Sequence, residues 1–404
     1  MSKKILFISY NGLTDPLGQS QILPYYKGLS AKGYEITLLS CEKEEVFKEG
    51  SALVQQQCEA WNINWEYTFY KNNFPVLSTI SNVNRLKKKA FEIAQKNSFD
   101  IFHCRSIIPA IIGHSLKEKL GGKLIFDIRG FWADERVEGG LWNIKNPVYK
   151  KIYSYFKKKE KLLFAESDYI VTLTENSKKY IADNFTTKNN FQVVPCCADL
   201  DHFNTNNYKD ASILELKKEL GIKEEEYVLT YLGSLGTRYM LREMLLFFRQ
   251  LKKLKENSKF LFITKSDTSQ MESLCEELDV DYNDIVIISS AYSEIPKYIL
   301  VGDASIFFIV SSFSGKAVSP TKQAEVMSLG LPIVVNQNLG DTDSIVLNTK
   351  TGFVADDFSD ETLSQVAQDL LAFIPDKDKF RKTAENYFSL ISGVEKYENV
   401  YQKI

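Results

Sequence analysis

Residues 304–336 read ASIFFIVSSFSGKAVSPTKQAEVMSLGLPIVVN, and this stretch decides the fold class. Its two ends, Ala304–Val310 and Leu331–Val335, are short and nearly continuous apolar runs. Such runs are typical of strands that are buried on both faces of a parallel sheet. The polar residues between them must then provide the connecting loop and the crossover helix. The stretch therefore predicts an α/β unit with a parallel sheet.

The start and end of the crossover helix are also marked in the sequence. Ser319 suits the N-cap position and Pro320 suits the first helical position. Gly330 followed by Pro332 is a strong stop signal. We therefore expect the helix to run from about Pro320 to Leu329.

A lysine in the first turn of this helix conflicts with the local electrostatics. Lys322 lies where exposed N–H groups already supply positive partial charge, and Glu325 follows it in the weaker orientation for a helix pair. An anion at the helix N-terminus would remove the conflict, because the amides of residues 319–322 and the ammonium would both point at it. A diphosphate is the obvious candidate. The alternative is a Lys322 side chain that extends to solvent from an ordinary helix.

The rest of the chain alternates strands and helices. Ile5–Ser9, Gln21–Lys32 and Glu35–Ser40 read as a first β-α-β unit. Further strands are expected at Phe99–Cys104, Lys123–Ile128, Ser167–Thr174, from Phe191, and at Tyr227–Leu232, Lys259–Thr264 and Ile285–Ser289. With 404 residues, the chain exceeds what one core usually serves. The pattern predicts two doubly wound Rossmann-like α/β domains facing a cleft.

Composition excludes several classes of protein. Hydrophobic residues at 44% and charged residues at 25% are ordinary for a globular protein, and a net charge of −2 argues against a nucleic-acid partner. No apolar run approaches the roughly 18 residues that would span a bilayer. The apolar core of the N-terminus, Ile5–Ile8, is too short for a signal peptide. We expect a cytoplasmic protein.

We expect no bound metal and no cofactor. The six cysteines include no C-x-x-C, and the three histidines are far apart in sequence. Asp341-Thr-Asp343 resembles a short metal motif, but three residues are weak evidence for a metal site, and we interpret the segment as a helix N-cap after Gly340.

Charged and indole side chains crowd the segment that follows the strand Lys123–Ile128. Ligands of α/β enzymes bind at the carboxyl ends of strands, and indoles beside carboxylates and arginines suit a saccharide. The segment contains Asp127, Arg129, Trp132, Asp134, Glu135, Arg136 and Trp142. The alternative is a surface network of ion pairs that satisfy one another.

Residues 145–164 form a basic, aromatic-rich helical stretch. It suits contact with anionic lipid, as an enzyme acting on a lipid-linked acceptor would need. The alternative is a solvated helix with an aromatic core face.

Two segments resemble glycosyltransferases of family 4, which are retaining enzymes with the GT-B fold. They are SPTKQAEVMSLGLPIV from Ser319 and VVPCCADLDHF from Val193, the latter resembling the interdomain segment of the family. The resemblance implies domains at 1–198, on the acceptor side, and 199–404, which binds a nucleotide sugar. It also implies that the last helix, about 380–404, packs back on the first domain.

The resemblance also implies roles for individual residues. The loop amides around Ser319, Pro320 and Thr321 hold the donor diphosphate, and Glu325 binds the ribose. The family usually has another glutamate where this chain has Ala317. This difference is expected to affect recognition of the sugar more than recognition of the nucleotide.

Other positions depart from the family pattern or rest on it more loosely. The family usually has a phosphate-binding arginine directly after Gly233 and a phosphate-binding lysine several residues later. This chain has Ser234 and Tyr239 at those two positions. Arg238 is therefore the candidate residue for stabilising the charge of the leaving diphosphate. In the loop Tyr10–Gln21, which lacks G-x-G-x-x-G, Gly18 is the residue expected to approach the phosphates, unless the loop is a plain turn.

In the segment after the strand Lys123–Ile128, Arg129 lies at the position where many members of the family have a histidine near the reacting centre. With Asp127 it is expected to face the donor sugar. Trp132, Asp134, Glu135 and Arg136 are then expected to face the acceptor.

The expected function is transfer of a hexose-type sugar from a nucleotide diphosphate sugar to a glycan or lipid-linked glycan in surface-polysaccharide biosynthesis. Asp127, Arg129, Arg238 and Lys322 are the candidate catalytic residues. Peripheral contact with the inner face of the membrane is expected through Lys145–Phe164. A nucleotide-sugar epimerase of the same fold and a non-catalytic, transferase-like binding subunit are the alternatives.

Overall fold

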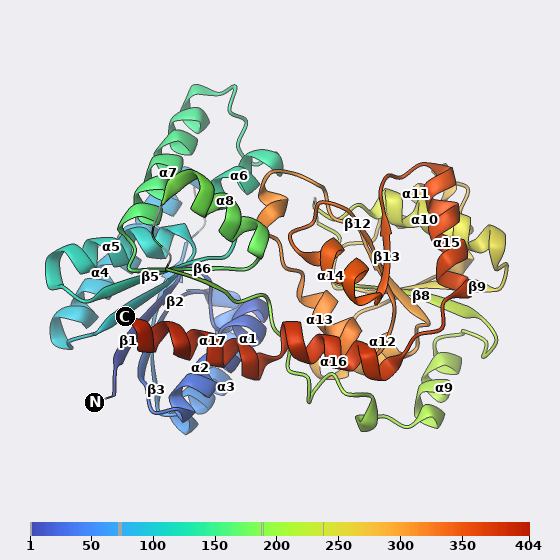
Figure 1. Cartoon of the computed structure of the whole chain (residues 1–404), viewed down its shortest axis with the longest axis horizontal. Coiled ribbons are helices and arrows are strands. Elements are labelled where there is room, and N and C mark those ends of the chain that lie inside the picture. Colours follow the sequence, from blue (N-terminus) through green and yellow to red (C-terminus); the bar gives the residue numbers. More distant parts are fainter. Residues whose placement is uncertain (1, 72–74, 187, 189, 237) are drawn as a thin grey trace. The chain divides into compact units, whose positions relative to one another are not determined.

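The computed structural model describes residues 2–71, 75–186, 188, 190–236 and 238–404, with the side chains of residues 75–77 left out. The described part of the chain divides into two compact units, each with its own parallel sheet (Figure 1). Unit 1 contains residues 1–195 and the C-terminal segment Leu390–Ile404, and unit 2 contains Cys196–Ser389. The expected pair of Rossmann-like α/β domains is therefore confirmed.

Unit 1 is built on a seven-stranded parallel sheet in the order β3-β2-β1-β4-β5-β6-β7. Its strands are β1 Lys4–Ser9, β2 Glu35–Lys43, β3 Ile63–Tyr70, β4 Ile101–Arg105, β5 Lys123–Ile128, β6 Tyr169–Thr172 and β7 Phe191–Val193. Its helices are α1 Pro16–Gln21, α2 Leu23–Ala31, α3 Glu44–Ala60, α4 Pro75–Lys96, α5 Ile107–Leu120, α6 Trp132–Glu138, α7 Pro147–Glu166, α8 Glu175–Phe185 and α17 Leu390–Lys403.

The centre of this sheet is apolar on both faces. Every residue of β4 is buried, and β1 and β5 expose only their first residue, as expected for parallel strands covered by helices on both sides. The strand order reverses between β1 and β4, which is where ligands bind in open α/β sheets.

The segment after β1 differs from the expected long loop. Asp15 and Pro16 begin a helix, so only residues 10–15 connect β1 to α1. The expected helix Gln21–Lys32 is instead α2, separated from α1 by Ile22, whose φ of −127° interrupts the helical backbone.

Unit 2 is built on a six-stranded parallel sheet in the order β10-β9-β8-β11-β12-β13. The strands are β8 Tyr227–Leu232, β9 Ser258–Ile263, β10 Ile285–Ile288, β11 Ala304–Phe307, β12 Ile333–Asn336 and β13 Gly352–Ala355. The α-helices are α9 Asp210–Glu219, α10 Leu241–Leu254, α11 Met271–Glu277, α12 Ile295–Leu300, α13 Thr321–Ser328, α14 Thr342–Thr349, α15 Asp360–Ala372 and α16 Lys377–Phe388. Single 3₁₀ turns are η1 Thr205–Asn207, η2 Tyr282–Asp284, η3 Tyr292–Glu294 and η4 Ser314–Ala317.

The predicted strand-loop-helix-strand stretch forms the centre of this sheet. β11 and β12 are fully buried and pair directly, and α13 connects them. The helix begins one residue later than expected, because Pro320 adopts an extended backbone and takes the N-cap position. Ser319 was therefore the wrong choice for the cap.

The C-terminal helix α17 completes unit 1. It lies beside α2, where a side chain on Gly28 would collide with Val394 at 2.7 Å (Figure 1). The ammonium of Lys3 donates hydrogen bonds to the carbonyls of Tyr401 (2.6 Å) and Ile404 (2.5 Å). Within the described residues, no helix combines the length and apolar character that crossing a bilayer requires.

Candidate functional site

Lys322, in the first turn of α13, is buried among aromatic rings. Its side chain is only 6% exposed, so the alternative in which it extends to solvent is wrong. The ammonium lies 3.9 Å from the ring centre of Tyr239 and 4.5 Å from that of Tyr231. It also lies 3.4 Å from the Tyr231 hydroxyl. These contacts place a cation in an apolar cage of unit 2.

The cage is closed by a glycine from another loop. Gly233, directly after β8, has a φ of +126°, and a Cβ there would lie 2.8 Å from the Lys322 ammonium. Only glycine therefore combines this backbone conformation with the close approach. The fold thus brings Gly233 and Lys322 together, although 89 residues separate them in sequence.

The same loop is tied to the end of β11. Residues 308–310 were expected to continue this strand, but they pair with residues 238–240 instead: the N–H of Val310 bonds to the carbonyl of Arg238 at 2.9 Å. The Arg238 guanidinium donates to the hydroxyl of Ser314 at 3.2 Å. Thr237, in this loop, lies outside the described residues.

Burial sets the charge state of the pair Lys322 and Glu325. Removal from water lowers the pKa of Lys322 to about 7, against the opposing attraction of Glu325. Removal from water raises the pKa of Glu325 to about 7, and Lys322 opposes that shift. Each residue is therefore poised to change protonation near neutral pH when a charged ligand arrives.

Apart from Gly18, the other predicted donor residues lie in the same unit. Ser319 accepts a hydrogen bond from the backbone N–H of Cys196 at 3.1 Å, which explains why its hydroxyl does not cap α13. Thr321 begins α13 and is partly exposed. The carbonyl of Ser234 accepts from the Tyr231 hydroxyl, which links it to the cage. Ala317 is buried in η4, so the missing glutamate leaves a small side chain there.

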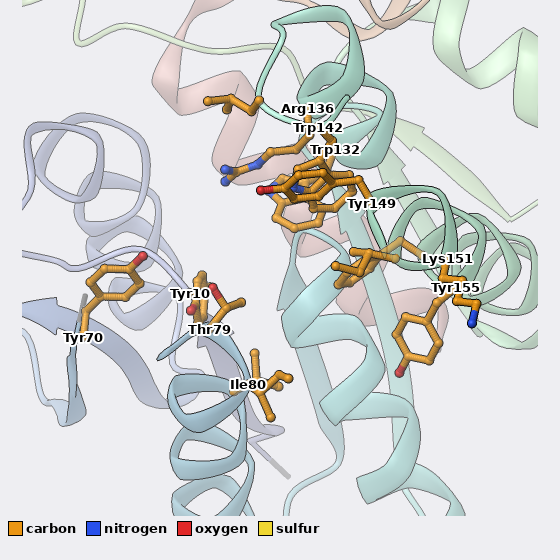
Figure 2. A pocket seen from close by; sticks show the side chains of 14 residues that line it. Tyr10, Tyr70, Thr79, Ile80, Trp132, Arg136, Trp142, Tyr149, Lys151 and Tyr155 are labelled. Atoms are coloured by element: carbon orange, nitrogen blue, oxygen red, sulfur yellow. The ribbon is translucent and has the colours of Figure 1, made fainter. Parts of the chain in front are cut away.

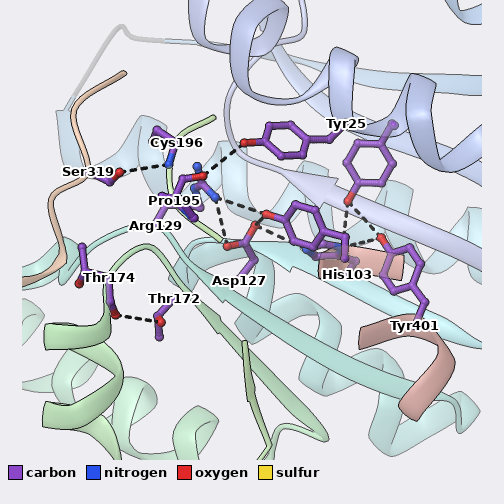
Figure 3. Close-up of polar contacts among 12 residues, drawn as sticks. Tyr25, His103, Asp127, Arg129, Thr172, Thr174, Pro195, Cys196, Ser319 and Tyr401 are labelled. Atoms are coloured by element: carbon purple, nitrogen blue, oxygen red, sulfur yellow. Dashed lines mark hydrogen bonds and ion pairs between the residues drawn. The ribbon is translucent and has the colours of Figure 1, made fainter. Parts of the chain in front are cut away.

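Asp127 and Arg129, at the end of β5, belong to a buried network in unit 1 (Figure 3). The Tyr397 hydroxyl of α17 donates to Asp127 at 2.9 Å, and His103 Nε2 of β4 lies 3.5 Å from the same oxygen. The Arg129 guanidinium lies 3.6 Å from the other oxygen. Asp127 therefore points into the unit and holds three elements together.

The network keeps Asp127 ionised and His103 neutral. Burial alone would raise the pKa of Asp127, but Arg129 and His103 hold it well below the usual range. Burial lowers the pKa of His103, against the opposing effect of Asp127. The hydroxyls of Tyr26 (2.9 Å) and Tyr401 (2.7 Å) lie against its other ring nitrogen.

The predicted acceptor residues of α6 separate into two groups. Asp134 is buried and accepts from Tyr153 and Lys157 of α7, both at 2.7 Å, so this residue belongs to a network of ion pairs and hydrogen bonds that is internal rather than on the surface. Arg136 instead stacks on Trp132, with its guanidinium carbon 4.7 Å from the ring centre.

Arg136 and Trp132 line a cavity of about 650 Å³ within unit 1, which we call the aromatic pocket (Figure 2). Trp142 also lines it and packs edge-on against Trp132, with ring centres 5.2 Å apart. Glu135 is not among its described lining residues, and the Glu135 carboxylate lies against Gly130, where a Cβ would meet it at 2.2 Å.

Gly18 makes its close approach to the protein itself. It lies in α1, and a Cβ there would meet the carbonyl of Gly12 at 2.3 Å. Sequence reasoning missed Glu42, whose buried carboxylate accepts from the N–H of Leu13 (2.6 Å) and the hydroxyl of Thr14 (2.5 Å). The connection between β1 and α1 is thereby fixed from β2. The sequence does not identify this role of Glu42, because Thr14 and Leu13 lie 28 and 29 residues away; its local partner Ser40 is two residues away.

Two family models match successive parts of the chain. The model described as Glycosyltransferase Family 4 matches residues 22–202, and the model described as Glycosyl transferases group 1 matches residues 212–387. An uncharacterised glycosyltransferase of Methanocaldococcus jannaschii is 24% identical over 263 residues. That match covers 63% of this chain and 64% of the relative, which is less than two thirds of its length.

Solved structures share the fold over almost the whole chain. A glycosyltransferase from Rickettsia africae is 17% identical with a TM-score of 0.72, covering 100% of this chain and 98% of that one. HepE from Anabaena, solved in complex with UDP and glucose, is 12% identical with a TM-score of 0.70, covering 100% of both chains. The architecture is therefore GT-B, and the two family matches support a glycosyltransferase family with this fold.

Proposed function

We propose that the protein is a retaining hexosyltransferase that moves a sugar from a nucleotide diphosphate sugar to a glycan or lipid-linked glycan in surface-polysaccharide biosynthesis. The observation that carries the proposal is the buried Lys322 at the N-terminus of α13, with Gly233 against its ammonium. The family matches and the fold shared with the UDP complex of HepE support it.

The donor diphosphate binds at the start of α13. Amides at the helix N-terminus donate to phosphate oxygens, while Lys322 and Arg238 neutralise the charge. Because the pKa of Lys322 is lowered to about 7 without ligand, the approaching diphosphate raises it and the lysine takes up a proton. Glu325 accepts hydrogen bonds from the ribose hydroxyls, and Gly233 leaves room for the phosphates.

In the transfer step the bond between the anomeric carbon and the diphosphate oxygen breaks. The acceptor oxygen forms its bond on the same face, so the anomeric configuration is retained, and its proton passes to a phosphate oxygen. Lys322 and Arg238 stabilise the charge that develops on the leaving diphosphate. We expect no metal cofactor.

Asp127 and Arg129 are proposed for the sugar side of the reaction. Because the Asp127 carboxylate is buried, its part is to position Arg129 rather than to touch the sugar. We further propose that the protein works in the cytoplasm, in contact with the inner face of the membrane through α7. That helix exposes Val148 and Tyr155 among its lysines.

The first experiment is thermal unfolding with a panel of nucleoside diphosphates and their sugars. A ligand at 100 times its Kd adds about 2.7 kcal/mol to the free energy of unfolding, so one nucleotide class is expected to raise the Tm clearly. Lys322→Met is expected to abolish that shift, whereas the matched Lys218→Met, at an exposed site of α9, keeps it.

Turnover then separates the alternatives. Transfer of a labelled sugar from the identified donor to an acceptor supports the proposal. Release of nucleotide with an epimerised sugar and no acceptor contradicts it in favour of an epimerase. A Tm shift without turnover on any acceptor contradicts it in favour of a binding subunit.

A further inference from the structure

The aromatic pocket of unit 1 has the lining of a site for an apolar ligand. Aliphatic side chains such as Ile80 and Val83 line part of it, and its aromatic members are Tyr10, Tyr70, Trp132, Trp142, Tyr149, Tyr155 and Phe156. None of the lining residues that the structure describes is an acid. A cavity of about 650 Å³ with this composition matches the size and lining of small-molecule sites.

The pocket has two walls, which come from different elements (Figure 2). Thr79 and Ile80 of α4, with Tyr10 and Tyr70 from the ends of β1 and β3, form one wall. The helices α6 and α7 and their connection form the other. Because the pocket begins at the carboxyl ends of these strands, it lies where α/β domains bind ligands.

The polar groups in the pocket include the Tyr10 hydroxyl and the Arg136 guanidinium. Burial raises the pKa of Tyr10 to about 12, so its phenol stays neutral. Arg136 keeps its charge above the face of Trp132. The nearby carboxylate of Asp134 accepts hydrogen bonds from Lys157 and Tyr153, so it does not neutralise the charge of Arg136.

One edge of the pocket is strongly cationic. Lys151 and Tyr155 line both the aromatic pocket and a neighbouring depression of about 460 Å³. Lys150 and Lys158 also line that depression. In the part of the chain that the structure describes, none of these three lysines has a carboxylate within ion-pair distance. An anion in this depression would therefore lie beside lysine side chains whose charge no described carboxylate neutralises.

We propose that the aromatic pocket binds the apolar chain of a lipid acceptor and that Lys150, Lys151 and Lys158 bind its phosphate. This inference rests on the proposed function, because it names the acceptor of the transfer. A free glycan fits less well, since it presents hydroxyl groups on all sides and most of the lining surface is apolar. A membrane surface alone requires no enclosed cavity, whereas a single chain attached to a phosphate matches the apolar pocket with its cationic edge.

The test is calorimetric titration of the full chain with decyl phosphate below its micelle concentration. Decanol serves as a probe that has only the alkyl chain, and inorganic phosphate serves as a probe that has only the phosphate. We expect decyl phosphate to bind at least about tenfold more tightly than either. Lengthening the alkyl chain by one methylene is expected to strengthen binding about threefold to fourfold while the pocket has room.

Two variants and a matched control locate the binding. Ile80 is 54% exposed, so Ile80→Glu places a charge in the pocket without disturbing the core, and Lys151→Glu reverses the charge at the edge. Each is expected to weaken decyl phosphate binding at least about tenfold. The control is Ile374→Glu, at a residue of unit 2 that is 89% exposed, and its affinity should equal that of the wild type.

Two results would overturn the inference. One is no binding of decyl phosphate at about 1 mM, or equal binding by wild type, Ile80→Glu and Lys151→Glu. The other is tight binding to vesicles of phosphatidylcholine and phosphatidylglycerol that Ile80→Glu leaves unchanged, together with weak decyl phosphate binding. That pattern would indicate a membrane-docking face instead.

Failure of this inference is distinguishable from failure of the proposed function. Both pocket variants leave unit 2 intact, so the Tm shift with the donor nucleotide should persist in them. If the nucleotide binds and decyl phosphate does not, the acceptor inference fails while the proposed function stands. If decyl phosphate binds and no nucleotide does, the proposed function fails, but the pocket is still a binding site for an alkyl chain attached to a phosphate.

Discussion

Lys322 is held in a place that is unfavourable for a charged side chain. The lysine is buried against Tyr231 and Tyr239, at the positive end of a helix, and no described carboxylate lies within ion-pair distance of its ammonium. A buried group of this kind lowers the stability of the free protein. Its presence at a loop junction is therefore better explained by ligand binding than by folding.

Replacing Lys322 by methionine is expected to stabilise the free protein. The folded-state pKa of about 7 lies below the ordinary value of 10.5, so the unfolded chain binds more protons between these pH values. The contribution of Lys322 to the free energy of unfolding therefore rises with pH across that window. Lys322→Met should be more stable by about 1–4 kcal/mol at pH 7, with the difference narrowing towards pH 10.5.

Denaturant unfolding at several pH values measures this difference, with Lys218→Met as the control. A variant less stable than the wild type at pH 7 would show that Lys322 serves the fold itself.

Single residues also show how far sequence reasoning reaches. Lys322 was identifiable because its conflict with the helix dipole is local and can be read from neighbouring letters. Glu42 and Tyr397 were not, because they act on partners that lie 28 and 270 residues away in sequence. The prediction that Ser319 caps the helix was wrong. The Ser319 hydroxyl accepts a hydrogen bond from the backbone N–H of Cys196, and the sequence does not reveal this contact.

At the scale of elements, local patterns predicted the buried strands and the helix between them. Strand β11 and helix α13 lie within the predicted ranges, and strand β12 extends one residue beyond its predicted range, to Asn336. The segment after β1 was predicted as a long loop although Asp15-Pro16 is itself a helix-start signal. The segment allowed two interpretations, a long functional loop or a short helix, and the Asp15-Pro16 helix-start signal predicted the observed helix.

Tyr397 joins helix α17 to the end of β5, because its hydroxyl donates a buried hydrogen bond to Asp127 and accepts one from Arg129 at 3.3 Å. Tyr397→Phe removes this donor and leaves the ionised carboxylate with Arg129 and His103. We expect a loss of about 1–3 kcal/mol in the free energy of unfolding, measured by denaturant titration. Tyr387→Phe, at a residue that is 41% exposed, should change it by less than about 0.5 kcal/mol. Equal stability of the two variants would show that the bond contributes nothing.

At the scale of the whole molecule, the chain places its C-terminal segment in the unit that contains its N-terminus. Residues 390–404 belong to unit 1, so their removal uncovers Tyr25, Tyr26 and His103 and leaves the sheet of unit 2 complete. Calorimetric unfolding of a chain ending at Ser389 should show a lower transition temperature for unit 1. An unchanged temperature for that transition would contradict the assignment of α17 to unit 1.

The central claim is that Lys322 holds the diphosphate of the donor. It is tested most directly by calorimetric titration of the nucleoside diphosphate at about pH 8, in two buffers of different ionisation enthalpy. Because Lys322 is largely neutral there without ligand, we expect binding to take up nearly one proton from the buffer. Lys322→Met should bind at least about tenfold more weakly and take up none. Equal affinity of the two proteins, with no proton uptake by either, would contradict the claim.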